Sequence, residues 1–183
     1  CFTNNIKLWD RVFINLIPDV SSFWKILIEE LKQYFTIKLN KSNNFLYIDT
    51  SGSHDDYMKN LGNKKNKYLR YIQNKFERDI GKIELIHYDN ELVQHLDEFL
   101  KIYSRRKKIL NQINPFDKTK ELKQFKKDVF QRYEKKGWVK LLILRSNDKN
   151  IAYCYYYYFN KIIYYSMPTF IDAFKKYSPG SIL

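Results

Sequence analysis

Three segments rich in strand-forming residues lie close together near the C-terminal end of this 183-residue chain. They run from Val139 to Arg145, from Ile151 to Phe159 and from Ile162 to Met167. The turn-prone residues 146–150 separate the first two segments, Asn160-Lys161 separate the last two, and both connections are short enough for hairpins. The sequence therefore predicts a three-stranded antiparallel meander. Tyrosines on both faces of its middle strand indicate a sheet that packs between helices.

Helical periodicity precedes the meander. Apolar residues recur every three or four positions in three segments, which predicts helices over residues 64–80, 90–110 and 119–136. A glycine directly follows the first and the last of these helices, as is common at helix ends. A strand is predicted at residues 82–88. This order of elements predicts an α/β (α+β) domain in which a mixed, mainly antiparallel sheet is flanked by helices.

The N-terminal part of the chain carries its own pattern. A strand is predicted at residues 8–17, and a helix capped by Ser21 or Ser22 is predicted to run to about Tyr34. Two short strands at residues 35–39 and 45–49 are expected to form a hairpin. The sequence Thr50-Ser51-Gly52-Ser53 breaks the regular pattern, so we place a boundary between two structural halves there.

The formal net charge of +13 admits a nucleic-acid-binding module, because such a field attracts polyanions before any specific contact forms. The same lysine excess is expected of an AT-rich coding sequence, since Asn, Ile, Tyr and Phe are also abundant while Ala, Gly and Pro are scarce. The basic helix at residues 64–80 is therefore interpreted first as a solvated outer face and second as a binding surface.

Cysteine usage and hydropathy predict a cytoplasmic protein with no membrane span. Cys1 and Cys154 are too few for a disulfide framework, and the longest apolar run, Ile151–Phe159, is about half the length of a membrane-spanning helix. The three histidines show no metal-ligand spacing, so no metal is expected. The chain begins without methionine and stops at Leu183 just after a helix-start signal, so we expect it to be a fragment.

One turn near the end of the chain has the chemistry of an anion site. Ser178 suits an N-cap, Pro179 suits the first helical position, and Gly180 suits a place where a ligand approaches the backbone closely. The amides of Gly180, Ser181 and Ile182 are expected to point outward. A preceding pair of lysines would add attraction for phosphate.

This order of elements, which ends in a Tyr-Ser-Pro-Gly turn, resembles the BioF2-like or CelD-like acetyltransferase domain. That domain is a branch of the GNAT superfamily and is related to the FemABX peptidyltransferases. The resemblance covers roughly residues 57–183. It rests on the basic helix start Lys65–Arg70, the core strand from Gly137-Trp138 through Leu141–Leu144, the aromatic strand Tyr164–Pro168 and the cofactor turn Lys176–Gly180. The turn is the most specific of these matches.

The chain also departs from that family. The family often carries an Arg-Trp pair in the helix that is represented here by Tyr103–Lys107, and this chain has no Trp there. The family often has an acidic residue where Ile171 aligns, although Asp172 lies next to it. Both differences concern acceptor recognition.

The resemblance implies a GNAT-like fold that is incomplete at its C-terminus. Residues 1–52 would be the remnant of a preceding GNAT-like α/β half, and residues 53–183 would be the truncated acetyltransferase domain. The implied reaction is direct transfer of an acyl group, foremost acetyl, from acyl-CoA to an amine, and the fragment alone is expected to be inactive. The acceptor would be a small molecule or a cell-envelope or polysaccharide precursor. Two alternatives remain open: a FemABX-type tRNA-dependent aminoacyl transferase, and a non-catalytic basic nucleic-acid-binding module.

The same resemblance implies a set of site residues. CoA would be bound by Met167, Lys175, Lys176, Tyr177, Ser178, Pro179, Gly180 and Ser181. Backbone amides near Met167 would meet the oxyanion, and Pro168 would loosen the strand pairing where the pantetheine arm enters, because proline cannot donate to a sheet ladder. Candidate proton carriers are Asp172, Tyr165 and Tyr177; a tyrosine, with its ordinary pKa near 10, is suited to protonate the leaving thiolate.

Overall fold

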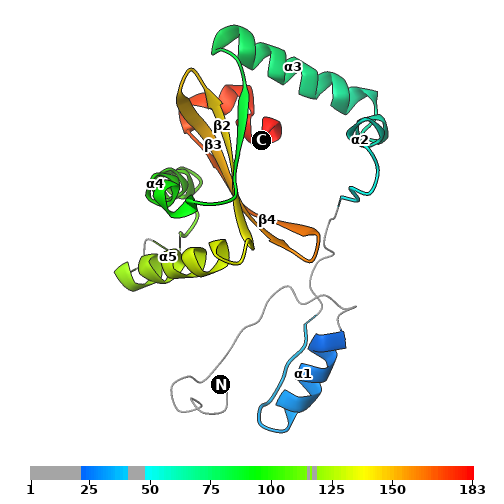
Figure 1. Ribbon diagram of the computed structural model, residues 1–183, viewed down its shortest axis with the longest axis vertical. Coiled ribbons are helices and arrows are strands. Elements are labelled where there is room, and N and C mark those ends of the chain that lie inside the picture. The colour runs from blue at the N-terminus through cyan, green and yellow to red at the C-terminus, as the bar shows by residue number, and fades with distance from the viewer. Residues whose placement is uncertain (1–21, 41–47, 115, 117–118) are drawn as a thin grey trace. The chain divides into compact units, whose positions relative to one another are not determined.

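The computed structural model describes residues 22–40, 48–114, 116 and 119–183 (Figure 1). The chain divides into two compact units, Cys1–Ser51 and Gly52–Leu183. In the first unit the predicted helix is confirmed as α1 (Ser22–Lys32), and none of its residues is buried. The strand predicted at residues 8–17 lies outside the described residues. Whether this unit is the remnant of another GNAT-like half stays a prediction.

The hairpin predicted after α1 is wrong in its first strand. Residues 36–40 have no regular secondary structure, and Leu39 is 65% exposed. A strand-forming composition becomes a strand only when a neighbouring strand accepts its hydrogen bonds and one of its faces is buried. Residues 41–47, which include most of the second predicted strand, lie outside the described residues.

The second unit begins with two helices. Ser53 caps α2 (His54–Asn60): its side chain accepts from the Asp56 amide, and the Asp56 side chain accepts from the Ser53 amide. This reciprocal capping box satisfies two amides that the first helical turn leaves without partners. The basic helix follows as α3 (Asn63–Asp79), which buries Ile72 and Phe76.

A four-stranded antiparallel sheet with strand order β1-β2-β3-β4 forms the centre of the second unit. Its elements, in chain order, are β1 (Glu84–Tyr88), α4 (Leu92–Ile109), α5 (Lys120–Glu134), β2 (Val139–Ser146), β3 (Lys149–Phe159), β4 (Ile162–Phe170), the 3-10 helix η3 (Asp172–Tyr177) and α6 (Pro179–Ile182). The structure therefore confirms the predicted mixed α/β class and its meander.

Two tight turns set the register of the meander. Asn147 and Asp148 join β2 to β3, Asn160 and Lys161 join β3 to β4, and all four residues have positive φ between 48° and 61°. Two-residue turns of this kind match the right-handed twist of the strands, and Asn and Asp tolerate the left-handed conformation better than most residues. The first connection is shorter than the predicted residues 146–150 because both strands extend into it.

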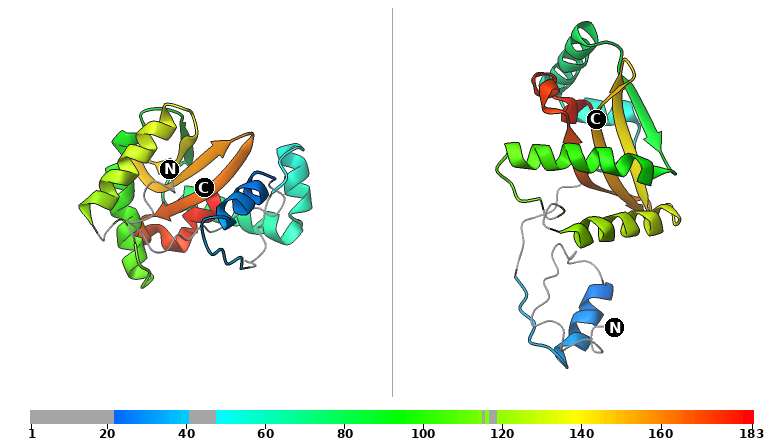
Figure 2. Two further views of the ribbon diagram at one scale, coloured as in Figure 1. Left: turned by 90° about the horizontal axis from the view of Figure 1, so that it is seen from below. Right: turned by 90° about the vertical axis from the view of Figure 1, so that its left-hand side faces the viewer.

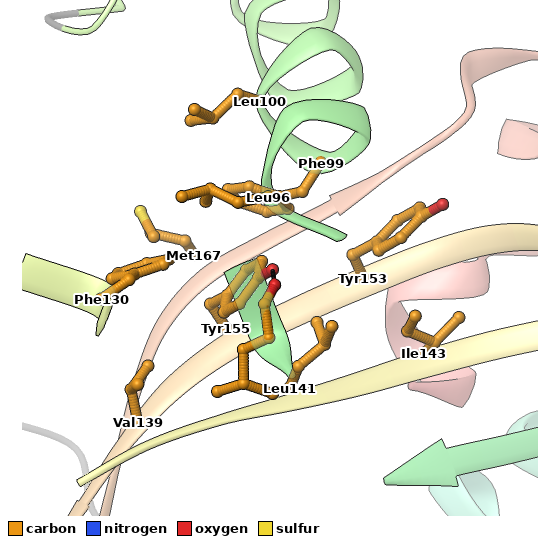
Figure 3. Packing of buried hydrophobic residues seen from close by; sticks show 11 residues of the cluster. Leu96, Phe99, Leu100, Phe130, Val139, Leu141, Ile143, Tyr153, Tyr155 and Met167 are labelled. Carbon is orange, nitrogen blue, oxygen red and sulfur yellow. Dashed lines mark hydrogen bonds between the residues drawn. The ribbon is translucent and has the colours of Figure 1, made fainter. Parts of the chain in front are cut away.

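Helices cover both faces of the sheet (Figures 1 and 2). On one face α4 and α5 bury Leu96, Phe99 and Phe130 against Tyr153 and Tyr155 of β3 (Figure 3). On the other face a second cluster joins α3, η3 and α6 to β2 and β3; it consists of Ile72, Phe76, Leu144, Ile151, Ala152, Tyr177 and Ile182. The alternation of side chains along β2 and β3 supplies both clusters, because successive residues of a strand point to opposite faces. This packing fixes the position of the C-terminal segment against the end of the sheet.

The longest helices of the second unit carry many charges. Within the described residues, no helix is long and apolar enough to cross a membrane.

Candidate functional site

A three-residue contact ties the end of β4 to α4. The Arg106 guanidinium lies 3.6 Å from the centre of the Phe170 ring, and one of its nitrogens lies 3.4 Å from a carboxylate oxygen of Asp172. Arg106 is mostly buried, with 21% of its side chain exposed. Because the planar guanidinium stacks on an aromatic face while it pairs with a carboxylate, it holds both residues in a defined arrangement. The chain therefore leaves the sheet in a direction that α4 fixes.

The turn after η3 has an unusual backbone at Ser178. This residue is the N-cap of α6, as predicted, but it has φ 51° and ψ 50°, and its side chain forms no capping hydrogen bond. Its hydroxyl lies 3.2 Å from that of Tyr68 on α3. A non-glycine residue in the left-handed region costs about 1 kcal/mol or more, and such strain often marks ligand sites. The predicted side-chain cap is wrong, because this conformation turns the hydroxyl toward α3.

Gly180 lies against the ring of Phe170. A Cβ atom added to Gly180 would meet two carbons of that ring at 3.7 Å, which is ordinary van der Waals contact, and the φ of Gly180 is not in the left-handed region. Neither backbone conformation nor packing within the described residues therefore requires glycine here. The residue is exposed, and its amide has no hydrogen-bond partner in the described part of the chain.

The next amide along the chain, that of Ser181, was also predicted to point outward, but it does not. The Ser181 amide donates to the Ser178 carbonyl at 2.8 Å, so it does not point outward to a ligand. The first turn of α6 is closed by this hydrogen bond between residues three apart, as in a 3-10 turn, so the Ser181 amide has its partner within the turn. Pro179 is buried at the first helical position, as predicted.

β4 is an edge strand of the described sheet. An edge strand leaves alternate backbone amides and carbonyls without ladder partners. Met167 faces Tyr155 and is 7% exposed, while the next pair along the ladder is Tyr165 with Tyr156, so Ser166 forms a bulge. The loosening expected at Pro168 is wrong by two residues: Pro168 stays opposite Cys154, and the irregularity lies at Ser166. A proline whose nitrogen faces away from the ladder does not disturb the pairing.

Tyr165 projects from β4 beside this bulge and is 61% exposed. Partial desolvation raises the pKa of its hydroxyl, and the nearby Cys154 thiol raises it further. The group therefore stays protonated at neutral pH, as an acid must. Burial raises the pKa of the Cys154 thiol to about 12, so this cysteine is not a nucleophile at neutral pH.

A series of polar contacts crosses β1, β2 and β3 next to Tyr165. The His87 ring lies 2.5 Å from the Tyr156 hydroxyl through Nε2 and 3.5 Å from an Asp89 carboxylate oxygen through Nδ1. Lys140 lies 2.7 Å from that same oxygen, and its hydrogen bond holds the pKa of Asp89 below its usual range. These residues could move a proton along the exposed part of the sheet face that carries His87 and Tyr165.

The remaining predicted residues divide between core and surface. Tyr177 is 4% exposed and packs edge-on against Phe76 of α3 at 5.8 Å, so much of its ring belongs to the core. Lys175 and Lys176 are exposed beside the turn. No hydrogen bond or ion pair joins Asp172, Tyr165 and Tyr177 to one another within the described residues. The structure thus brings Tyr177 and Gly180 to Phe170 and does not gather the three proton carriers into one cluster.

Three residues at this site were not predicted as functional: Arg106, Phe170 and Tyr68. A signal existed for Arg106, because it follows Phe99 and Tyr103 on the same helical face, and a charged residue on a buried stripe needs a partner. Nothing in the sequence indicates that Tyr68 meets Ser178. Within the described residues, no group of three or more His, Cys, Asp or Glu side chains could hold a metal ion.

A protein-family model matches most of the second unit. The model of the family described as "Acetyltransferase (GNAT) domain" matches residues 63–183, which is about two thirds of the chain. The match includes α3, the whole sheet and the turn at Ser178. No curated protein matches the chain significantly.

Proposed function

Because the chain belongs to the acetyltransferase (GNAT) domain family, we propose that it transfers an acetyl or other acyl group from acyl-CoA to an amine by direct attack. The family match and the mixed sheet flanked by helices support acyl transfer in general. The thioester donor, the amine acceptor and the named residues are proposals. The closer relation to BioF2-like or CelD-like domains also stays a prediction.

Gly180 is the observation that carries this proposal. Protein contacts leave room for a side chain there, and the backbone does not require glycine. Glycine is also the residue that lets a ligand come within hydrogen-bonding distance of the main chain. We therefore infer that a bound group occupies the space in front of Gly180, where the unpartnered amide would donate to it.

The residues beside Gly180 suit a diphosphate. Lys175 and Lys176 are exposed on the preceding 3-10 helix, and the hydrogen bond with Tyr177 raises the pKa of Lys176, which favours the charged form of that lysine. The four described residues of α6 supply little helix dipole, so these lysines and the Gly180 amide would provide most of the attraction. From there, starting at the Phe170 end of β4, the pantetheine arm would run along the open edge of the strand toward Met167 and the bulge at Ser166.

The reaction needs a neutral amine, a donor for the developing oxyanion and a proton for the departing thiolate. A free amide on the edge of β4 near Met167 would serve the oxyanion. Tyr165 would protonate the thiolate, because its exposed hydroxyl lies beside the bulge of β4 and carries a proton at neutral pH. Asp172 is engaged by Arg106, so we assign it to positioning of the turn in preference to proton transfer.

The acceptor is proposed only by class. The family implies an amine on a small molecule or on a cell-envelope or polysaccharide precursor. The contacts that join Asp89, His87 and Tyr156 lie on the exposed part of the sheet face next to Tyr165, where they would accept the proton that the attacking amine loses.

Isothermal titration of the full-length protein with CoA tests this proposal through Gly180→Glu. The substitution places a carboxylate where the diphosphate would bind, and like charges brought together cost several kcal/mol, so we expect CoA affinity to fall by about 100-fold or more. Gln131→Glu adds the same charge to an exposed position of α5 and should leave the affinity unchanged. Unchanged affinity in a folded Gly180→Glu variant would remove the pyrophosphate site from this turn.

A further inference from the structure

We propose that an aromatic and basic stripe on α3 binds the adenosine 3′-phosphate end of the acyl donor. This inference rests on the proposed function, because it names the part of CoA that lies beyond the pyrophosphate. The stripe consists of Lys64, Tyr68, Tyr71 and Lys75, with Lys176 beside it. It makes α3 the element that recognises the nucleotide.

The four α3 residues occupy one face of the helix. Their spacing of four, three and four residues brings them into line, and the helical rise gives the line a length of about 16 Å. The neighbouring face of the helix buries Ile72 and Phe76 in the core. Tyr68 is 49% exposed and Tyr71 is 59% exposed, so two large aromatic rings lie on the surface of a helix that is otherwise covered with polar residues.

The stripe adjoins the proposed pyrophosphate site. The Tyr68 hydroxyl lies 3.2 Å from the Ser178 hydroxyl, two residues before Gly180. Further along the helix, the Lys75 amine lies 5.8 Å from the centre of the Tyr71 ring and 5.9 Å from that of Tyr177, the residue just before Ser178. A ligand whose diphosphate meets Gly180 can therefore extend directly across α3.

The lysines of the stripe are not neutralised by nearby carboxylates in the described part of the chain, so their positive charge can attract a phosphate. Asp79 is the nearby carboxylate, and it pairs with Arg78 at 2.7 Å; that contact lowers the pKa of Asp79, with smaller effects from Lys176 and Lys75. Within the described residues Lys75 and Lys176 form no salt bridge of their own, and both lie near aromatic rings. A purine base stacks on exposed aromatic rings, and a phosphate monoester pairs with free ammonium groups.

These features favour a nucleotide over a phosphopantetheine carrier protein. A basic helix alone would also attract an acidic carrier protein, which brings the same pantetheine arm. The exposed rings of Tyr68 and Tyr71 decide the choice, because a flat aromatic surface flanked by ammonium groups matches a purine with an attached phosphate. A carrier protein would instead need a broad docking surface, which two exposed rings do not provide.

Three ligands separate these possibilities in a calorimetric titration of the full-length protein at low salt: CoA, 3′-dephospho-CoA and 4′-phosphopantetheine. CoA should bind about 2- to 5-fold more tightly than dephospho-CoA, as expected for one exposed charge interaction, and added salt should shrink this difference. Phosphopantetheine, which lacks the base, should bind about 10-fold or more weakly than dephospho-CoA. Equal binding of all three would overturn the inference and favour a carrier-protein donor.

Variants then assign the effect to the stripe. Tyr71→Ala should remove most of the difference in affinity between dephospho-CoA and phosphopantetheine. Lys75→Ala should remove most of the difference in affinity between CoA and dephospho-CoA. Arg70→Ala removes a charge from another exposed face of the same helix and should change neither ratio. Circular dichroism checks that each variant keeps its helical content.

The outcomes distinguish this inference from the proposed function. If none of the three ligands binds the folded protein, the proposed acyl-CoA function fails together with the inference. If all bind and Lys75→Ala and Arg70→Ala have equal effects, the CoA site stands and the α3 stripe is refuted.

Discussion

Arg106 offers the sharpest test of how the fold positions the candidate site. Its side chain, on α4, contacts both Phe170 and Asp172, and 21% of it is exposed. Replacement by alanine removes a stacking contact worth about 0.5–2 kcal/mol and a partly exposed ion pair worth about 0.2–1 kcal/mol. We therefore expect Arg106→Ala to lower the free energy of unfolding by about 1–3 kcal/mol.

The same substitution should weaken CoA binding, because it frees the segment that leads into the turn. If CoA binding must then order that segment at a cost of about 1.4 kcal/mol, the affinity for CoA drops about tenfold. Arg106→Lys keeps the charge without the planar stacking group, so it should recover only part of both losses.

Urea denaturation and calorimetric titration with CoA measure the two effects. Arg105→Ala is the matched control, since the neighbouring arginine is exposed and forms no ion pair within the described residues. If Arg106→Ala and Arg105→Ala have the same stability and the same CoA affinity, the reasoning about this contact is wrong.

Two further predictions concern buried ionisable groups. Burial lowers the pKa of Lys126, whose amine lies 4.4 Å from the Phe130 ring centre, to about 8, whereas an unfolded lysine titrates near 10.4. Between these pH values the unfolded chain therefore binds more protons than the folded chain. The free energy of unfolding of the parent protein, measured in urea and compared with that of Lys126→Met, should rise from pH 8 to pH 10. A difference between the two proteins that stays constant with pH would contradict this prediction. The second prediction concerns Cys154, which should resist a thiol-reactive disulfide reagent in the folded Cys1→Ser protein and react once urea unfolds the protein. Rapid labelling of the folded protein would show that the thiol is accessible and would contradict this prediction.

Local rules were enough for most elements of the second unit. The helices at α3, α4 and α5 were predicted because their apolar residues follow the helical period, and Gly81 and Gly137, both with positive φ, end two helical segments. The meander was predicted because turn-prone residues, 146–150 and the pair Asn160-Lys161, separate three strand-forming segments. In each case the determining interaction lies within a few residues of the chain.

Long-range contacts account for what the sequence did not reveal. The bulge at Ser166 depends on how β4 pairs with β3, and the left-handed conformation of Ser178 is held in a turn that meets Tyr68, which is 110 residues away. The Arg106–Asp172 contact likewise joins residues 66 positions apart. Residues 35–39 failed as a strand because composition does not supply a pairing partner. The structure has a turn at Ser178, as predicted, but its role in cofactor binding stays a prediction, and its hydrogen-bonding pattern could be read only from the structure.

Hydrogen–deuterium exchange of the full-length protein with saturating CoA tests the central claim most directly. We predict slower exchange at residues 163–169 on the edge of β4 and at residues 178–183 around Gly180, with no change in α5. CoA that binds without protecting either segment, or that protects α5 instead, would contradict the assignment of the acyl-donor site to this edge and turn.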